Sequence, residues 1–247
     1  MSIETERDWI GLSRVGRIVR LTLDALEREV RQGVTTAALD RVAAGVFAAH
    51  GARSAPALVY GFPGTVLLSV NDEVVHGVPG ARALERGDLI KLDVTAEKDG
   101  YMADAARTVI VGEGSETAHR LRACARAAFR RALGVARAGR RVSEIGRVIE
   151  KEVRSWGFHV LRGLDGHGIG RTIHEPPTVF NYCNPLQADV LADGLVLTIE
   201  PIISAGTGRA VEDADGWTIR TADGSLSAHH EHTLAITKER PVLLTSL

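Results

Sequence analysis

Apolar residues recur every three or four positions in two stretches near the start of the chain. Between Trp9 and Val30 this spacing is carried by Leu12, Val15, Val19, Leu23 and Leu26. An alanine-rich stretch follows, with Thr36 as its candidate N-terminal cap and His50-Gly51 at its end. Both stretches predict amphipathic helices, and Gly33 stands where the C-terminal cap of the first helix belongs.

After residue 51 the chain changes to short apolar segments separated by turn residues. Four of these segments are predicted strands, at Leu58–Tyr60, Val66–Val70, Leu89–Thr95 and Tyr101–Val111. The residues between them include Pro-Gly, Gly-Asp and Asp-Gly pairs, which favour tight turns.

The succession of helices and strands then occurs a second time. Helices are predicted from Ser115 to Val135 and from a Ser143 cap to Gly157. Four strands follow, at Val160–Leu161, Leu195–Glu200, Trp217–Thr221 and Ser227–Ile236. This order predicts two related halves around one sheet, although no sequence repeat is evident. Because no linker separates the halves, we expect residues 1–247 to form a single α+β domain with helices covering the sheet.

The charge balance excludes several functions. The 247 residues include 30 Lys and Arg against 31 Asp and Glu, for a formal net charge of −1. Proteins that bind DNA or an anionic membrane usually carry a basic excess, so neither partner is expected. The start of the chain does not resemble a secretory signal, and no run of about 18 apolar residues could span a bilayer. The two cysteines lie in unlike contexts, which favours a reducing compartment, and we expect a cytoplasmic protein.

Two aspartates flank the predicted turn at Asp99-Gly100. If these two residues form a hairpin loop, Thr95 pairs with Asp104, and Asp93 becomes the diagonal neighbour of Asp104 on the same face, roughly 7 Å away or less. Two like charges on a half-buried sheet face must share a proton or gather round a cation. The pair is therefore a candidate for metal binding.

A glycine-rich segment and an apolar strand add three candidates. His167 lies among three glycines, where the backbone can approach a ligand closely, and His174 follows seven residues later. Glu200 ends an apolar strand whose burial would leave its carboxylate in need of a partner.

A histidine-rich strand near the end of the chain adds the last candidate. Alternation along this strand places Glu231 on one face with Thr233, while His230 and His232 point the other way. Glu231 can therefore face a buried site that its two histidine neighbours do not reach.

Each candidate taken alone has an ordinary structural explanation. Arg107 or Lys91 would neutralise a hydrated aspartate pair, an isolated histidine in a glycine run is often hydrogen-bonded within the fold, and a histidine run can begin an exposed strand. Taken together, however, the candidates form a set of side chains that could bind divalent metal ions. That set contains four carboxylates and one imidazole, from Asp93, Asp104, His167, Glu200 and Glu231. Such oxygen-rich ligands suit divalent Mn, Fe, Co or Zn, and four negative ligands favour two ions per chain.

Eight short motifs follow one another along nearly the whole chain. They are Ser69–Pro79, Lys91–Thr95, Asp104, Gly166–Arg171, His174–Pro177, Thr198–Pro201, Trp217-Thr218 and Glu231–Thr233. In this order they resemble the type I methionine aminopeptidases, a metal-dependent peptidase family. The resemblance implies the pita-bread fold, in which two pseudo-symmetric halves form a curved antiparallel sheet backed by helices, with the metal site at the centre.

The resemblance also implies how the candidate ligands are divided between two ions. Asp93 would chelate one ion, Asp104 and Glu231 would bridge both, and His167 with Glu200 would complete the ligands of the other. The implied reaction removes the initiator methionine of nascent proteins when the second residue is small, through a metal-activated water that attacks the first peptide bond.

Further residues take substrate-directed roles by the same resemblance. Glu200 would accept the proton of the water and pass it to the leaving amine. His174 would donate to the oxyanion and His76 to the peptide group on the leaving side. Phe62 and Trp217 would belong to an apolar slot for the methionine side chain.

The chain departs from the family pattern at several positions. Pro56 and Leu67 stand where family members often carry cysteines, and Val75 precedes the first substrate histidine. His229 and His230 stand where a glutamine and an aromatic residue are frequent. These departures leave the details of the methionine slot and the effect of the two histidines open.

Two other functions remain as alternatives. A proline-specific peptidase of the same fold shares the five ligands, but such enzymes usually have a separate N-terminal domain. A metal-free binding relative would have lost a ligand, whereas all five are present here.

The expected partner is the N-terminal methionine of a nascent polypeptide, bound by a monomer. A transient ribosome contact is conceivable through a basic helix face, although a solvated surface explains that face more simply. The face is formed by Arg122, Arg126, Arg130 and Arg137.

Overall fold

The computed structural model describes residues 1–246, and helices cover the outer side of its strands. The helices are α1 Glu6–Glu29, α2 Thr36–His50, α3 Ala55–Tyr60, α4 Glu116–Val135 and α5 Ser143–Ser155, with a 3₁₀ turn at Leu244–Ser246. No helix within residues 1–246 is long and apolar enough to cross a membrane.

The strands are short except for one central hairpin. They are β1 Arg53–Ser54, β2 Leu67–Val70, β3 Glu73–Val75, β4 Leu89–Lys98, β5 Tyr101–Ile110, β6 His159–Val160, β7 Gly166–Gly168, β8 Glu175–Val179, β9 Val196–Ile199, β10 Ile202–Ser204, β11 Ala210–Glu212, β12 Ile219–Thr221, β13 Ser227–His229, β14 His232–Ala235 and β15 Val242–Leu243. Strand β4 pairs with β1, β2 and β5, and a second ladder runs in the order β15-β14-β9-β7-β8. The pairings in both ladders are antiparallel, as expected for this fold class.

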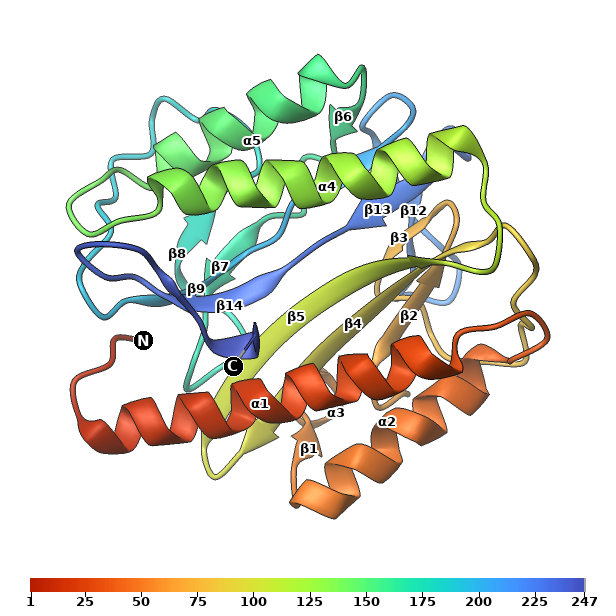
Figure 1. The fold of residues 1–247 in the computed structure, drawn as a ribbon, viewed down its shortest axis with the longest axis horizontal. Coiled ribbons are helices and arrows are strands. Elements are labelled where there is room, and N and C mark those ends of the chain that lie inside the picture. Colours follow the sequence, from red (N-terminus) through yellow and green to blue (C-terminus); the bar gives the residue numbers. More distant parts are fainter. Residues whose placement is uncertain (247) are drawn as a thin grey trace.

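Two helix pairs cover the strands, one for each half of the chain (Figure 1). Helix α1 packs on β4 and β5, and α4 packs on β10 and β13. The halves meet where β5 runs beside the end of β13, with Ala106 and Glu231 exchanging backbone hydrogen bonds of 3.0 and 3.3 Å. The predicted fold class, with helices backing antiparallel strands, is confirmed, but the strands within residues 1–246 pair in four separate sheets rather than in the one sheet predicted.

The hairpin of β4 and β5 has the predicted register. Thr95 is the partner of Asp104, and Lys98 is the partner of Tyr101. Asp99 and Gly100 occupy the loop with φ of 52° and 81°, which is the left-handed conformation that a two-residue hairpin loop requires. Asp93 and Asp104 therefore project from the same face.

The predicted strand at Leu58–Tyr60 is wrong, because these residues belong to α3. Ser54 caps this helix by accepting a 3.3 Å hydrogen bond from the backbone N–H of Ala57, and Pro56 stands in its first turn. Gly61 ends it at φ 74°. These helix boundary signals outweigh the apolar character of a three-residue run.

Several predicted boundaries are also wrong by a residue or more. The cap of α2 is Thr35 rather than Thr36, and α1 ends at a Val30 cap, so that Gly33 lies in the following turn. Ser143 is already inside α5 and makes no cap. The predicted strand at 227–236 is interrupted between β13 and β14, at His230 and Glu231.

Two apolar cores lie between the helix pairs and the strands. Leu12, Val19 and Leu23 of α1 are buried against β4 and β5, while Leu121 and Ala128 of α4 are buried over the second half. These cores fix both strand layers on their helix side and leave the opposite face of the strands to form the site.

Candidate metal centre

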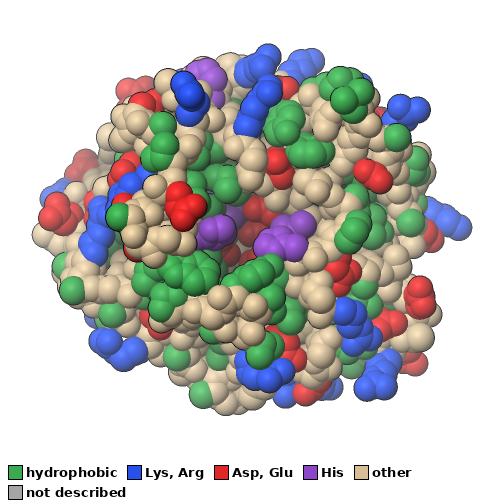
Figure 2. All heavy atoms as spheres, turned by 180° about the vertical axis from the view of Figure 1, so that it is seen from behind, with side chains coloured by type: hydrophobic (Ala, Val, Ile, Leu, Met, Phe, Trp, Pro, Cys, Tyr) green, Lys and Arg blue, Asp and Glu red, His purple; other side chains and the backbone are tan. Residues whose placement is uncertain are grey.

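A cavity of about 680 Å³ opens on the side of the strands opposite the two helix pairs, with Pro56 and Tyr60 of α3 in its lining. Figure 2 shows this face, where acidic side chains lie at the bottom of a hollow, histidines stand beside them and apolar side chains surround the opening. The five predicted ligands all line this cavity. The structure therefore brings together residues that are far apart in the sequence, the first and last of which, Asp93 and Glu231, are separated by 138 positions.

Strand ends and one strand interruption position the carboxylates. Asp93 and Asp104 project from the middle of the β4–β5 hairpin, and Glu200 follows the last residue of β9. Glu231 lies in the break between β13 and β14, held by its backbone pairing with Ala106. All four carboxylates are less than 10% exposed.

Burial makes this cluster of carboxylates electrostatically unfavourable without a cation. Loss of water raises the pKa of Asp104 to about 6. Desolvation raises the pKa of Asp93, Glu200 and Glu231 well above the ordinary range, and the charge of Asp104 adds to the shift in each case. Removal of these protons requires a compensating positive charge nearby.

Threonine hydroxyls orient part of the cluster. Thr95 Oγ1 donates to Asp104 Oδ2 at 2.8 Å, and Thr198 Oγ1 donates to Glu200 Oε1 at 2.8 Å. The backbone N–H of His167 donates to Thr198 Oγ1 at 3.1 Å. Thr198 therefore fixes the positions of a carboxylate and a histidine together.

His167 presents one ring nitrogen to the carboxylates. Its Nδ1 lies 3.0 Å from the carbonyl oxygen of Gly168, which assigns the proton to Nδ1 and leaves Nε2 with a free lone pair. Nε2 is 3.5 Å from Glu200 Oε1. Burial, with the charge of His174 second, lowers the pKa of His167 to about 4, so the ring is neutral at physiological pH and able to bind a metal.

The donor set fits divalent ions. Ligand atoms of Asp104, His167 and Glu231 lie within 4.8 Å of one another, and those of Asp93, His229 and Glu231 do so as well. Oδ1 of Asp104 and Oε1 of Glu231 are buried and have no hydrogen-bond partner among residues 1–246. Two groups that share Glu231, each with an unpaired buried oxygen, are the arrangement expected for two ions with bridging carboxylates.

The two basic residues that offered an alternative explanation have other partners. Lys91 Nζ donates to the carbonyl oxygen of Asn71 at 2.7 Å. Arg107 forms ion pairs with Asp24 and Glu27 of α1, at 2.7 and 3.2 Å. Neither residue forms an ion pair with Asp93 or Asp104 among the contacts of the described chain.

The two predicted substrate histidines line the same cavity. His174 Nδ1 lies 2.6 Å from Tyr60 Oη, and its ring stands edge-on to His167 with centroids 4.3 Å apart. His76 has the positive φ of 59° that is rare outside glycine, which marks a conformation imposed by its surroundings. Desolvation lowers the pKa of both His76 and His174.

Apolar residues form one wall of the cavity. Phe62 and Trp217 pack edge to face with ring centroids 5.3 Å apart. Pro56, Leu67 and Val75, the residues that depart from the family pattern, line the same cavity. The wall is therefore apolar without the cysteines often present in the family.

Contacts that the sequence analysis did not predict hold the segment that carries His174. Arg171 Nη2 donates to Asp8 Oδ1 at 2.8 Å and to Tyr101 Oη at 2.9 Å. Glu175 accepts from the backbone N–H of Arg171 at 2.7 Å. Asp8 is 163 positions from Arg171, so local patterns contain no signal for this contact.

His229 is a second residue whose position the sequence left open. It lines the cavity beside Asp93, Glu200 and Glu231 and also borders a second cavity behind the strand, which His230 and His232 line as alternation predicts. The basic face of α4 is shorter than predicted, because Arg137 lies beyond the end of the helix at Val135.

The chain is similar to known metallopeptidases over nearly its whole length. Residues 11–238 match the sequence profile of metallopeptidase family M24. Methionine aminopeptidase 2 of Bacillus subtilis is 42% identical over 249 residues, which cover 100% of both chains. The crystal structure of methionine aminopeptidase from Thermotoga maritima has a TM-score of 0.96 and 35% identity, and the match covers 99% of each chain.

Proline-specific relatives share the fold at lower similarity. A prolidase from Pyrococcus furiosus has a TM-score of 0.79 and 22% identity, and the match covers 98% of this chain but 65% of the prolidase. This likeness extends to the fold alone.

Proposed function

Because this chain belongs to the methionine aminopeptidases of metallopeptidase family M24, we propose that the central cavity is where it removes N-terminal methionine from peptides. The observation that carries the proposal is the buried cluster of four carboxylates and His167 at the bottom of an apolar-walled cavity. The family is metal-dependent, and the cluster has the ligand chemistry that divalent ions require.

We assign five residues to two ions, of Co, Mn, Fe or Zn. Asp93 would hold one ion, Asp104 and Glu231 would be shared by both, and His167 with Glu200 would complete the ligands of the other. The shared position of Glu231, and the separation of Asp93 from Asp104 and His167, are supported by two ligand groups that have Glu231 in common. When bound, such ions lower the pKa of water and polarise the carbonyl group of the scissile bond.

The side chains of the cluster move the protons of the reaction. Oε1 of Glu200 lies 3.5 Å from Nε2 of His167 and accepts a hydrogen bond from the Thr198 hydroxyl. We assign it to take a proton from the attacking water and to return that proton to the leaving nitrogen. A carboxylate in this position can both accept and release a proton.

The histidines at the cavity stabilise charge that develops on the substrate. If the Tyr60 hydroxyl donates to Nδ1 of His174, the proton of the neutral ring lies on Nε2, where it can be donated to the oxyanion. His76 donates to the peptide group on the leaving side. Both rings are neutral at physiological pH because their pKa values are lowered.

The apolar wall selects the first residue of the substrate. Phe62 and Trp217 form a slot beside the carboxylate cluster, where an unbranched thioether fits. A methionine in the slot places the first peptide bond next to the cluster, and a small second residue avoids the cavity rim. We propose nascent polypeptides as the substrates, a monomer as the working form and the cytoplasm, where translation supplies them, as the location. A transient ribosome contact through Arg122, Arg126 and Arg130 is the further partner that we propose.

Peptide hydrolysis after metal removal tests this function. We would strip the protein with a chelator, restore Co, Mn, Fe or Zn separately, and follow Met-Ala-Ser, Met-Leu-Ser and Ala-Pro-Ser. We expect methionine release from Met-Ala-Ser only when metal is present, and a loss of about 10²–10⁴-fold in kcat for Glu200→Gln. Release of alanine from Ala-Pro-Ser would instead support a proline-specific peptidase. No turnover with any metal would favour a binding protein.

A further inference from the structure

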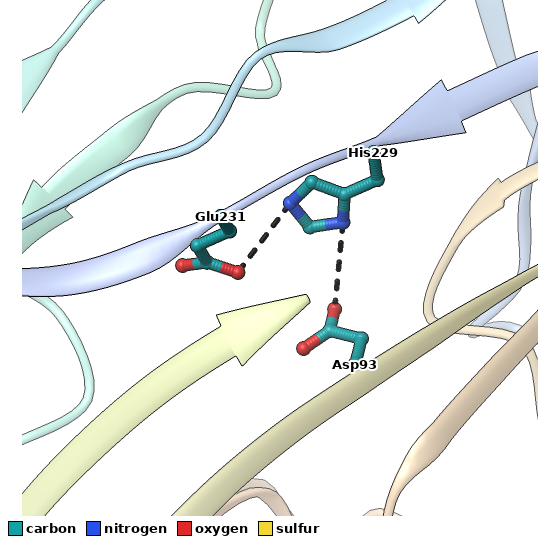
Figure 3. Close-up of side chains that lie close together, drawn as sticks. All are labelled: Asp93, His229 and Glu231. Atoms are coloured by element: carbon teal, nitrogen blue, oxygen red, sulfur yellow. Dashed lines mark ion pairs between the residues drawn. The ribbon is translucent and has the colours of Figure 1, made fainter. Parts of the chain in front are cut away.

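The imidazole of His229 is buried among the carboxylates and has no hydrogen-bond partner within residues 1–246. The side chain belongs to the last residue of β13 and is 1% exposed. Neither Nδ1 nor Nε2 has a hydrogen-bond partner within residues 1–246. Figure 3 shows the ring between the carboxylates of Asp93 and Glu231, with a nitrogen turned toward each. A buried polar side chain without a hydrogen-bond partner is costly, so the ring fits a ligand that residues 1–246 do not supply.

One nitrogen of the ring is placed to share an ion with the carboxylates. Nε2 lies 3.4 Å from Glu231 Oε2 and 3.6 Å from Glu200 Oε2, whereas Nδ1, on the other side of the ring, lies 3.9 Å from Asp93 Oδ2. All three distances exceed those of N–H to oxygen hydrogen bonds, which are about 2.7–3.2 Å. An imidazole binds an ion through one nitrogen, and one nitrogen of His229 lies within 4.8 Å of ligand atoms of both Asp93 and Glu231. Two donors that each bind one ion at about 2.1 Å lie about 3.0–3.4 Å apart for adjacent ligands and about 4.2 Å apart for opposite ligands.

The backbone holds the ring in this position. The backbone N–H of His229 donates to Thr108 Oγ1 at 2.8 Å, and Thr108 Oγ1 donates to the carbonyl oxygen of His229 at 2.7 Å. Thr108 belongs to β5, the strand that also carries Asp104. His229 is therefore fixed to the same hairpin as the aspartates rather than to a mobile loop.

We propose that His229 is a sixth protein ligand of the centre, an imidazole for the ion that Asp93 and Glu231 hold. The inference rests on the proposed function, because it requires the cluster to bind metal. The group of Asp93, His229 and Glu231 then matches the group of Asp104, His167 and Glu231, and each ion has one imidazole.

The added imidazole changes which ions the Asp93 position prefers. With Asp93, Asp104 and Glu231 alone this position offers only oxygen, which suits Mn, whereas a nitrogen ligand favours Zn, Fe and Co. We expect the ratio of Zn to Mn affinity at the Asp93 position to fall at least about tenfold in His229→Gln.

Nitrogen NMR of the zinc-loaded protein, labelled with ¹⁵N at histidine, tests the assignment. Wild-type protein should show two zinc-bound ring nitrogens, from His167 and His229, and His229→Gln should show one. The matched control is His230→Gln, because His230 is adjacent in sequence but faces the ring of Phe129 with centroids 5.1 Å apart. This control should show the wild-type pair.

The outcomes separate the inference from the proposed function. One zinc-bound nitrogen in wild-type protein, unchanged in His229→Gln, would overturn the inference and leave the five-ligand centre intact. No zinc-bound nitrogen in wild-type protein would contradict the metal centre itself. Because the count in wild-type protein decides the matter, the test stands even if His229→Gln folds poorly.

Discussion

At the scale of residues, His174 and Tyr60 form a pair whose members have separable effects. His174→Ala removes the proposed oxyanion donor, and we expect kcat to fall by about 10²–10³-fold. Tyr60→Phe removes only the 2.6 Å hydrogen bond that orients the His174 ring. Such a hydrogen bond contributes about 0.5–1.5 kcal/mol, so we expect kcat to fall by less than about fifteenfold. Steady-state hydrolysis of Met-Ala-Ser measures both, with metal content as the control. Equal losses in the two variants would contradict the division of roles.

The residues of the centre differ in how well local patterns predict them. The period of two along a strand correctly sends Glu231 into the cavity and His230 behind the strand. The same period places His229 with Glu231, so the signal for the further ligand was present in the sequence. The contact between Arg171 and Asp8 had no such signal, because it joins segments that only the complete fold brings together.

At the scale of elements, two helical glycines should respond oppositely to alanine. A Cβ at Gly16 of α1 would collide with the backbone carbonyl of Leu244, whereas a Cβ at Gly45 of α2 would meet no atom within 4 Å. Gly16→Ala should therefore destabilise the protein by about 1–3 kcal/mol. Gly45→Ala should stabilise it by about 0.5–1 kcal/mol, because alanine is the better helix former. Urea unfolding of the metal-free proteins measures both, and a gain for Gly16→Ala would show that the last turn does not pack on α1.

The length of an element decides whether the sequence predicts it. The long helices have sustained apolar spacing and the central hairpin has an Asp-Gly loop, so local patterns suffice for them. Strands such as β7 and β10 have three residues each, too few for any periodicity, and their partners lie elsewhere in the chain. These short strands form because the packing of the whole chain brings each of them beside its partner strand.

At the scale of the whole molecule, the buried carboxylates of the centre should lower the free energy of unfolding of the metal-free protein. Burial, followed by repulsion from Asp104, Glu200 and Asp93, raises the pKa of Glu231 well above 4.5. The folded state therefore binds this proton more tightly than the unfolded chain, so stability falls as the pH rises above about 4.5.

Glu231→Gln removes that effect. Without metal the variant should be more stable than wild-type protein, by a margin that grows from weakly acid to weakly alkaline pH. With Co²⁺ the order should reverse, because an ion at 100 times its Kd adds about 2.7 kcal/mol to the protein that binds it. Urea unfolding across this pH range, with chelator and with Co²⁺, measures both effects. A metal-free variant less stable than wild-type protein would contradict the electrostatic description of the site.

The central claim is that one buried cluster holds two ions, and anomalous X-ray scattering from crystals grown with Co²⁺ tests it most directly. We predict two anomalous peaks in the cavity, one beside Asp104 and His167 and one beside Asp93 and His229, with Glu231 between them. A cavity without anomalous density under saturating Co²⁺, or density confined to another part of the molecule, would contradict the claim.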